Sequence, residues 1–323
     1  MNKEDLRIVY MGTPDFAVEP LRRLLEGGYN VAGVITMPDK PAGRGHKLQA
    51  SPVKQFALEH NLPLLQPEKL KAENFLEALR AWKADLQIVV AFRMLPEVVW
   101  AMPRLGTFNL HASLLPQYRG AAPINWAVIN GETETGITTF FLKQEIDTGE
   151  VIQQVRIPIA DTDDAGAVHD RLMTLGGRLV TETVDAILAG EVRPIPQEEM
   201  YQPGSELRPA PKIFKETCRI SWNQPVKTVY DFVRGLSPHP TAWTELHQPE
   251  TEPVVVKVFE TEKLPQSHDL TPGTIRTDGK TYLHVAAADG FIGIRSLQLP
   301  GKKRLNTDEL LRGFRIKEGS RME

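Results

Sequence analysis

The sequence places an asparagine and a histidine two residues apart in a run typical of a β-strand, Thr107-Phe108-Asn109-Leu110-His111. Alternate residues of a strand share a face, so Asn109 and His111 are expected to project together. An amide and an imidazole held side by side can donate hydrogen bonds to a developing oxyanion, which is what acyl transfer requires. The alternative is a structural pair whose two side chains bond to each other.

A carboxylate that could orient this histidine is Asp147. A catalytic histidine needs a partner to fix its tautomer. Asp147 lies between two predicted strands, 136–142 and 151–159, with Gly149 beside it for a turn. An Asp-Thr-Gly is also an ordinary turn signal, but we expect it and His111 to meet at strand ends on one side of a sheet. Ser113 lacks the glycines of an esterase nucleophile, so transfer is expected to go directly to an external amine.

The elements that must position these residues alternate along the first half of the chain. Residues 6–160 switch between short apolar, β-branched runs and segments of helical period. This pattern predicts the α/β class, with a doubly wound, Rossmann-like, mostly parallel sheet whose ligands bind at the carboxyl ends of its strands. The strand that holds Asn109 is expected fifth in the chain, and a long helix is expected over 165–189.

The 323 residues are too many for one ordinary core, so we expect two domains. The catalytic domain is predicted over residues 1–190. Residues 191–212 are rich in proline and charge, and predict a linker. Residues 213–323 combine a helix over 226–236 with short strands between Gly, Pro and Asp turns, which predicts a smaller, OB-like β-barrel.

Composition excludes several classes of protein. The net charge of −3 gives no overall attraction to nucleic acid, so such a site would have to be local. Metal-ligand spacing is missing, and Gly12 stands alone where a dinucleotide fingerprint needs three glycines. We find no transmembrane or signal segment, and the single cysteine, Cys218, fits a reducing compartment. We therefore expect a cytoplasmic protein that binds neither a metal nor a membrane.

Residues 108–142, followed by 145–152, resemble the formyltransferases that use 10-formyltetrahydrofolate. In that family an Asn, a His and an Asp form a catalytic trio, which falls here on Asn109, His111 and Asp147. The resemblance implies 10-formyltetrahydrofolate as formyl-donor co-substrate, and it implies that Asp147 also contacts the folate. The other folate-site positions that the resemblance implies are Phe92, Met94, Leu95, Ser113, Leu114, Leu115 and Pro116.

One segment departs from the family pattern. The usual run after the fourth strand is Ala-Tyr-Gly ahead of Leu-Pro, whereas residues 91–96 here read Ala-Phe-Arg-Met-Leu-Pro. The glycine is missing, and Arg93 is expected beside the pterin pocket. This departure affects the folate contacts of the segment and leaves the trio intact.

The acceptor of the formyl group must be inferred from other segments. Residues 36–57 resemble the loop found in the branch of the family that formylates methionyl-tRNA. This resemblance implies methionyl-initiator tRNA as partner, and hence a role in translation initiation during protein biosynthesis. The basic residues implied in tRNA binding are Lys40, Arg44, Lys47 and Lys54, set against the single acid Asp39. A solvated surface loop is the alternative interpretation.

Other acceptors and other classes stay open. The β-rich second domain argues against the shorter glycinamide ribonucleotide branch, whereas a nucleotide-sugar formyltransferase is a rival enzyme. A folate- or RNA-binding protein without turnover is the non-enzymatic alternative. Small β-barrels often bind nucleic acid on one face, so the domain over 213–323 is expected to bind the tRNA as well. Its basic cluster, formed by residues 302–304 with Arg312, Arg315 and Lys317, is weaker evidence because Asp308 and Glu309 interrupt it. We expect a monomer.

Overall fold

The computed structural model describes residues 2–42, 47–202 and 204–323. The chain divides into two compact units. The first unit comprises Met1–Gly120, Thr135–Ile157 and His169–Pro209, and the second comprises Ala121–Glu134, Pro158–Val168 and Ala210–Glu323. The units therefore differ from the predicted division, because two short segments before residue 190 group with the C-terminal residues.

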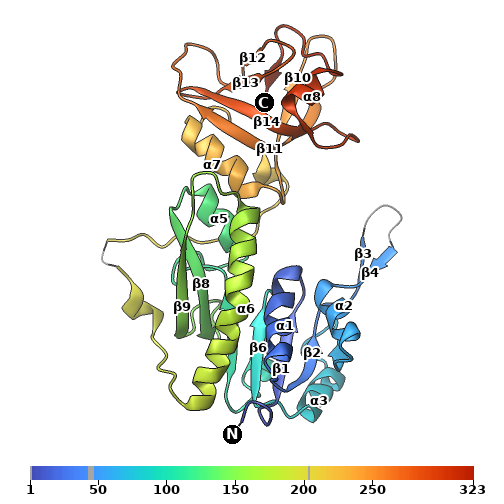
Figure 1. The fold of residues 1–323 in the computed structure, drawn as a ribbon, viewed down its shortest axis with the longest axis vertical. Coiled ribbons are helices and arrows are strands. Elements are labelled where there is room, and N and C mark those ends of the chain that lie inside the picture. Colours follow the sequence, from blue (N-terminus) through green and yellow to red (C-terminus); the bar gives the residue numbers. More distant parts are fainter. Residues whose placement is uncertain (1, 43–46, 203) are drawn as a thin grey trace. The chain divides into compact units, whose positions relative to one another are not determined.

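A seven-stranded sheet forms the centre of the first unit, and Figure 1 shows its strands beside the helices that connect them. Its order is β5 (Leu64–Leu65), β2 (Val31–Ile35), β1 (Ile8–Gly12), β6 (Leu86–Val90), β7 (Thr107–His111), β8 (Glu134–Phe141) and β9 (Val151–Pro158). The pairs from β5 to β7 are parallel, whereas β7 and β8 are antiparallel. The predicted doubly wound, mostly parallel sheet is confirmed, and β7 is its fifth strand in chain order.

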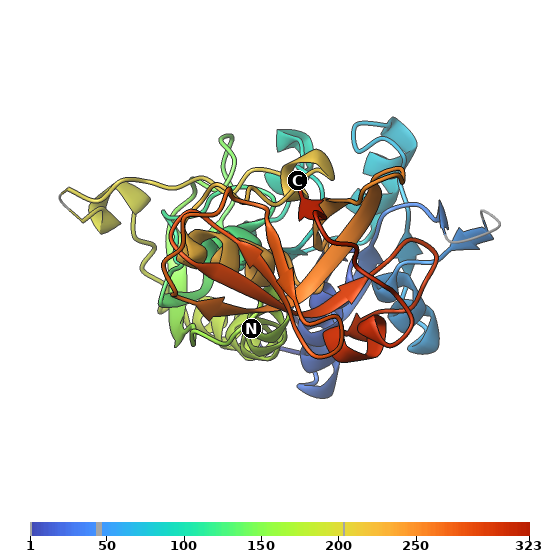
Figure 2. The same cartoon turned by 90° about the horizontal axis from the view of Figure 1, so that it is seen from above.

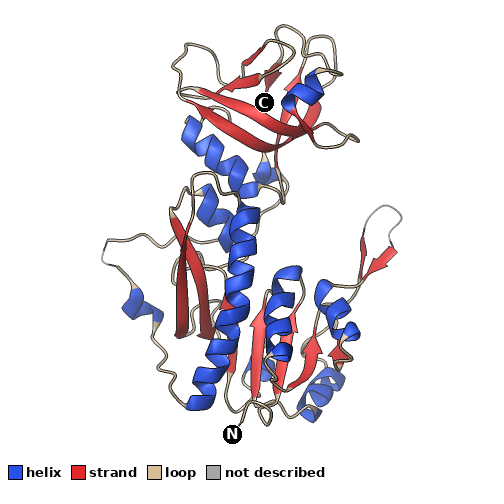
Figure 3. Ribbon diagram, viewed as in Figure 1, coloured by secondary structure: helices blue, strands red, loops and turns tan. Residues whose placement is uncertain are grey.

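Helices cover both faces of this sheet (Figure 3). The helices of the first unit are η1 (Asp15–Ala17), α1 (Val18–Glu26), α2 (Pro52–Glu59), α3 (Glu73–Ala81), α4 (Glu97–Trp100), η2 (Gln197–Met200) and most of α6 (Ala165–Ala189). On one face, apolar side chains of α3 and α4 share a core with Val89 and other strand residues. On the opposite face, α6 approaches β7 so closely that a Cβ on Gly176 would meet Leu110 at 2.8 Å.

This arrangement determines which way the β7 side chains point. Leu110 faces α6, so its neighbours Asn109 and His111 must face the other side of the sheet. Asn109 lies in register with Val89, which belongs to the core on the α3 and α4 side. The predicted common face of Asn109 and His111 is therefore confirmed.

The predicted basic loop contains regular structure of its own. The strands β3 (Lys40–Ala42) and β4 (Lys47–Gln49) pair in an antiparallel hairpin. The proline in β3 is compatible with this pairing because a two-stranded hairpin leaves an outer edge that needs no hydrogen-bond donor. Residues 43–46, and with them Arg44, lie outside the described residues. After the hairpin, Ser51 caps α2 by accepting a hydrogen bond from the Lys54 amide at 3.0 Å.

The predicted linker is partly built into the first unit. Ile195 and Val151 exchange two main-chain hydrogen bonds of 2.9 Å, and η2 follows. Gln197, the first residue of η2, has an exposed fraction of 0%. Proline and charged residues give the segment the composition of a linker, but the buried side-chain amide of Gln197 holds it against the first unit.

The second unit is built on an antiparallel sheet, whose strands are seen from above in Figure 2. Its strands are β10 (Ala242–His247), β11 (Val254–Leu264), β12 (Ile275–Thr277), β13 (Leu283–Ala286), β14 (Phe291–Gln298), β15 (Leu305–Asn306) and β16 (Arg321–Met322). The sheet order runs from β12 through β13, β14, β11 and β10 to β16. A bridge between Thr274 and Arg321 brings the two edges together, so the sheet is nearly closed as predicted for a small barrel.

Helices accompany the barrel within the second unit. They are α5 (Pro123–Ile129), η3 (Glu216–Cys218), α7 (Val226–Leu236) and α8 (Thr307–Leu311). The apolar side of α7, including Val229 and Val233, packs into the barrel core. Among the residues that the structure describes, no helix is both long and apolar enough to cross a membrane.

Candidate active site

The end of β7 holds His111, whose exposed fraction is 7%. Its Nε2 atom lies 2.9 Å from the main-chain carbonyl oxygen of Tyr118. A carbonyl oxygen can only accept, so Nε2 carries the proton in this arrangement. The Nδ1 atom faces Asp147, whose Oδ2 is 4.0 Å away. The main chain of Tyr118, rather than the predicted carboxylate, thus fixes the tautomer of His111.

Asp147 reaches His111 by a route that differs from the prediction. Because β8 runs antiparallel to β7, its final residues lie beside the start of β7, where the Leu142 amide donates to the Thr107 carbonyl at 2.8 Å. The chain after β8 then returns toward His111. Asp147 lies between β8 and β9 and meets His111 as expected, but the carboxyl ends of β7 and β8 lie at opposite edges of the sheet, so the returning loop brings the two residues together.

The loop around Asp147 is held in an unusual backbone conformation. Asp147 has a φ of 55°, in the left-handed region. Its Oδ2 accepts a hydrogen bond of 3.0 Å from the amide of Gly120. The loop from Tyr118 to Gly120 therefore contacts both partners, with a carbonyl on His111 and an amide on Asp147.

Asn109 completes the set on the same face of β7. Its side chain is half-buried, and within the described part of the chain its amide makes no hydrogen bond. This excludes the alternative in which Asn109 and His111 form a bonded structural pair there. An amide without a protein partner, next to an imidazole and a carboxylate, can donate to a bound carbonyl oxygen.

The implied folate residues differ widely in exposure. Met94 has an exposed fraction of 72%, and Phe92 and Leu114 are half-buried. The buried residues of the set are Leu95, Ser113, Leu115 and Pro116. The Ser113 hydroxyl donates to the Gln117 carbonyl at 2.7 Å and shapes the loop after β7. The residues whose side chains remain accessible for a ligand are Met94, Phe92 and Leu114.

Arg93 is directed at the protein main chain. Its guanidinium donates to the carbonyl of Glu68 at 2.8 Å and to that of Pro67. Burial lowers the pKa of the Arg93 guanidinium from its usual value. The Arg93 guanidinium, which was expected beside a pterin pocket, thus links the segment after β6 to the segment before α3.

The implied tRNA residues lie around the β3–β4 hairpin. Lys40 is exposed, and Lys47 belongs to β4. Lys54 forms an ion pair of 2.6 Å with Asp39, and its hydrogen bond lowers the pKa of that carboxyl group. Gln66 donates to the same carboxylate at 2.9 Å. Lys54 therefore anchors the base of the hairpin.

Three of the six residues in the C-terminal basic cluster have partners in the structure. Arg304 contacts Glu260, and Arg312 contacts Asp308 at 2.8 Å. The Lys317 ammonium donates to the carbonyl of Pro249 at 3.0 Å. The charges of Arg304, Arg312 and Lys317 are therefore each matched by a nearby acceptor.

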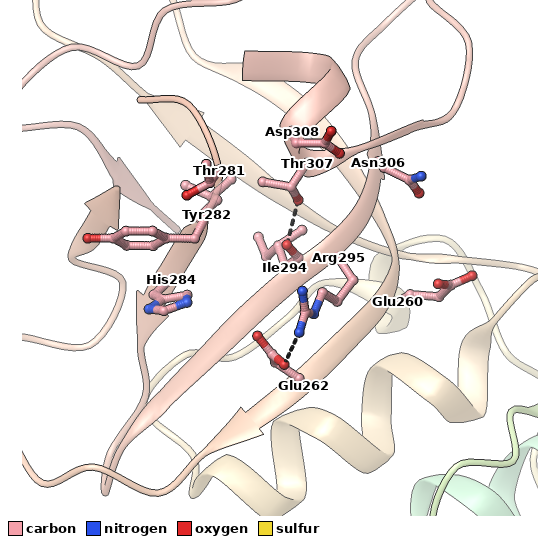
Figure 4. Close-up of a pocket in the computed structure, with 11 residues that line it drawn as sticks. Glu260, Glu262, Thr281, Tyr282, His284, Ile294, Arg295, Asn306, Thr307 and Asp308 are labelled. Carbon is pink, nitrogen blue, oxygen red and sulfur yellow. Dashed lines mark hydrogen bonds and ion pairs between the residues drawn. The ribbon is translucent and has the colours of Figure 1, made fainter. Parts of the chain in front are cut away.

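A pocket of about 250 Å³ lies on the second unit, and Figure 4 shows its lining. Arg295 points toward Glu262, with which it forms an ion pair of 2.5 Å. None of the residues implied by the sequence lines this pocket. Among the described residues, no three His, Cys, Asp or Glu side chains gather in a way that could hold a metal.

Sequence reasoning missed three contributors to the site. The Tyr118 carbonyl and the Gly120 amide are main-chain groups, so the residue types in the sequence do not indicate their roles. Gln197 donates to the carbonyl oxygens of Asp147 and Gly149 at 2.8 and 2.7 Å. It lies in a segment whose composition indicated only a linker, and no local pattern marks it.

Comparisons with known proteins identify the class that this fold and site define. The family model described as formyl transferase matches residues 6–184, and that of the formyl transferase C-terminal domain matches residues 212–315. The chain belongs to the formyl transferase family.

Its curated relatives carry one particular name. The methionyl-tRNA formyltransferase of Bacteroides fragilis (strain ATCC 25285) is 79% identical over 323 residues, which cover 100% of this chain and 99% of the relative. That of Bacteroides thetaiotaomicron is 76% identical, with 100% of both chains covered.

Solved structures share the fold at much lower identity. A sugar 3N-formyl transferase, WlaRD, has a TM-score of 0.62 and 18% identity over 92% of this chain and 99% of its own. HypX from Aquifex aeolicus, solved with tetrahydrofolic acid, has a TM-score of 0.61 and 20% identity over 95% of this chain and 47% of its own. These structures support the fold, and sugar formyl transfer is only a distant relation.

Proposed function

We propose that the chain transfers the formyl group of 10-formyltetrahydrofolate to the amino group of methionyl-initiator tRNA. The observation that carries the chemistry is the Asn109 amide, which has no hydrogen-bond partner among the described residues, on the same face of β7 as His111, whose Nδ1 lies 4.0 Å from Asp147. The acceptor rests on the curated relatives, which are named for methionyl-tRNA and match the whole chain at up to 79% identity. Such a reaction belongs to the cytoplasm, where translation begins.

Each residue of the trio has a distinct role in the proposed reaction. The amine nitrogen attacks the formyl carbon, and Asn109 with protonated His111 Nδ1 donates to the oxyanion that develops. Nε2 cannot serve here because it already donates to the Tyr118 carbonyl. Asp147 accepts the proton that the amine loses, directly or through a water. The bond from carbon to N10 of the folate then breaks as N10 takes up the proton that Asp147 accepted from the amine.

The residues at the end of β6 and after β7 fit a folate. Exposed Met94 and half-buried Phe92 offer apolar contact to a pterin ring, and Leu114, after β7, is a further half-buried apolar residue. Buried Leu95, Ser113, Leu115 and Pro116 shape the segments that carry these side chains. We assign the folate site to this edge of the sheet, with Asp147 contacting the folate as well as the amine.

The β3–β4 hairpin is assigned to the tRNA. Lys40, Arg44 and Lys47 supply cations for phosphate contacts, while Lys54 secures the hairpin through Asp39. Binding of methionyl-tRNA should weaken with rising salt through counterion release, and binding of the small folate should respond much less. Removing one phosphate contact with Arg44→Ala should reduce the salt slope by about one. An equal slope in wild type and variant removes the hairpin from the tRNA site.

The function is tested with both acceptors side by side. Purified chain, 10-formyltetrahydrofolate and either methionyl-tRNA or a dTDP-amino sugar are mixed, and release of tetrahydrofolate is followed by absorbance. Mass spectrometry then identifies the formylated acceptor. We expect formylmethionyl-tRNA and no formylated sugar. Formylation of the sugar alone would refute methionyl-tRNA as the acceptor. No turnover with either acceptor would refute the proposal that the chain is a formyltransferase.

The trio is tested by Asn109→Ala. Loss of one oxyanion donor lowers turnover by roughly 10²–10³-fold, while KM for the folate should change little. Gln144→Ala, on an exposed residue of the Asp147 loop, is the matched control and should behave like wild type. Wild-type turnover by Asn109→Ala would remove Asn109 from the oxyanion site.

A further inference from the structure

Gln197 joins the two loops that hold the trio. Its Nε2 donates to the carbonyl oxygens of Asp147 and Gly149 at 2.8 and 2.7 Å. Its Oε1 accepts from Nε and Nη2 of Arg119 at 3.1 and 2.7 Å. The side chain is fully buried, and both of its amide hydrogens and both acceptor positions are used.

The residues that Gln197 connects are the direct neighbours of the catalytic contacts. Arg119 lies between Tyr118, whose carbonyl accepts from His111, and Gly120, whose amide donates to Asp147. On the other side, Gln197 binds the carbonyl of Asp147 itself. One amide therefore sets the spacing between the partner of His111 and the loop that carries Asp147.

The backbone at these positions needs such support. Tyr118 and Asp147 have φ values of 58° and 55°, in the left-handed region that costs a non-glycine residue about 1 kcal/mol or more. A residue stays in this region when surrounding contacts determine its conformation. The four hydrogen bonds of Gln197 supply contacts to both loops at once.

Residues on both sides of Gln197 in the sequence also contact the segments around His111 and Asp147. Before it, Ile195 pairs with Val151, at the start of β9. After it, the Arg208 carbonyl accepts from the Tyr118 amide at 2.7 Å, and the Arg208 amide donates to Gln117 at 2.9 Å. Contacts of Ile195, Gln197 and Arg208 thus reach both loops, and Gln197 is the buried residue among these three.

We infer that Gln197 is a positioning residue of the formyl-transfer site, which acts by holding His111 and Asp147 at their working separation. This inference rests on the proposed function. It assigns a role to the segment after α6 that goes beyond connecting two units.

The substitution Gln197→Met keeps the size of the side chain and removes all four hydrogen bonds. A misplacement of about 1 Å at a reacting group costs roughly 10²-fold in rate, so kcat should fall about 100-fold. KM for 10-formyltetrahydrofolate should stay within about threefold, because Asp147 is the one folate residue that Gln197 holds, and the apolar folate residues keep their positions. Gln202→Met makes the same substitution at an exposed site of the same segment and should leave kcat unchanged.

A second background separates positioning from general stability. If Gln197 acts through His111 and Asp147, its loss should have almost no further effect on the residual turnover of His111→Ala, because effects within one catalytic unit are not additive. An equal fold loss in both backgrounds would overturn the inference. So would wild-type kcat in Gln197→Met.

Folding is checked by circular dichroism and thermal melts of every variant. If Gln197→Met does not fold, Gln197→Glu replaces it, since this variant keeps the acceptors for Arg119 and loses both donors to the Asp147 loop. If neither variant folds, Gln197 serves the fold rather than the site, and the inference is overturned. Failure of wild type to formylate methionyl-tRNA would instead refute the proposed function.

Discussion

Gly149 offers a perturbation whose size follows directly from the structure. A Cβ added at this position would lie 1.6 Å from the carbonyl oxygen of Phe141 in β8. An ordinary contact needs 3.4 Å, so the Asp147 loop must retreat by about 1.8 Å or the strand must deform. Asp147 is two residues away, and its 3.0 Å hydrogen bond from Gly120 cannot survive a shift of that size.

We therefore expect Gly149→Ala to lower kcat by roughly 100-fold or more, since misplacement by about 1 Å already costs on the order of 10²-fold. Forced overpacking also destabilises by about 1–3 kcal/mol, so the melting temperature should fall by several degrees. The assay is formylation kinetics with both substrates varied, together with a thermal melt.

The matched control is Gly313→Ala, where an added Cβ would meet nothing within 4 Å among the described residues. This variant should keep the wild-type kcat and melting temperature. A Gly149→Ala protein with wild-type kcat would show that the Asp147 loop can move without loss of function, and would refute the reasoning.

Three further outcomes concern stability and reactivity. Arg234→Met breaks a buried ion pair of 2.8 Å with Asp231 and should lower the free energy of unfolding in urea by about 3 kcal/mol. This is the low end for such pairs, because a lysine also contacts the Asp231 carboxylate. A decrease below about 1 kcal/mol would contradict this. Hydrogen bonds from Thr281, first its hydroxyl and then its amide, hold the pKa of Asp278 far below its usual value. Stability from this group is present above pH ~4 and is lost as pH falls further, so Asp278→Asn should lower the melting temperature at pH 7 and less so at pH 3; a pH-independent difference would speak against it. Burial raises the pKa of the Cys218 thiol, so a disulfide reagent at pH 7 should label it only after unfolding, and rapid labelling of the folded protein would disprove this.

Much of the fold could be predicted because its signals are local. The helices predicted over 165–189 and 226–236 coincide with α6 and α7. Their signals are the helical period of apolar residues and the residues at the helix ends, which are all close together in the sequence. Apolar runs likewise gave β1, β2, β6 and β7. The hairpin of β3 and β4, and the two-residue strand β16, escaped because pairing rather than residue type defines them.

The site was predictable only where side chains carry the chemistry. Asn109 and His111 share a face through the two-residue period of a strand, and the sequence contains that period. The sequence did not contain the reversal of β8, which brings Asp147 to His111 by a returning loop. The Tyr118 carbonyl and Gln197 depend on contacts between distant segments, which no local pattern encodes.

The second unit combines α5 with α7, which is synthesised much later, and this order affects how the unit can form during synthesis. Asn125, in α5, donates to the carbonyl of Gly235, in α7, which lies 110 residues later. A ribosome adds about 5–20 residues per second, so α5 leaves the tunnel on the order of 10 seconds before its partner exists. During that interval Ile129 lacks the core that it later joins. The helix α5 can therefore join that core only after α7 has been synthesised.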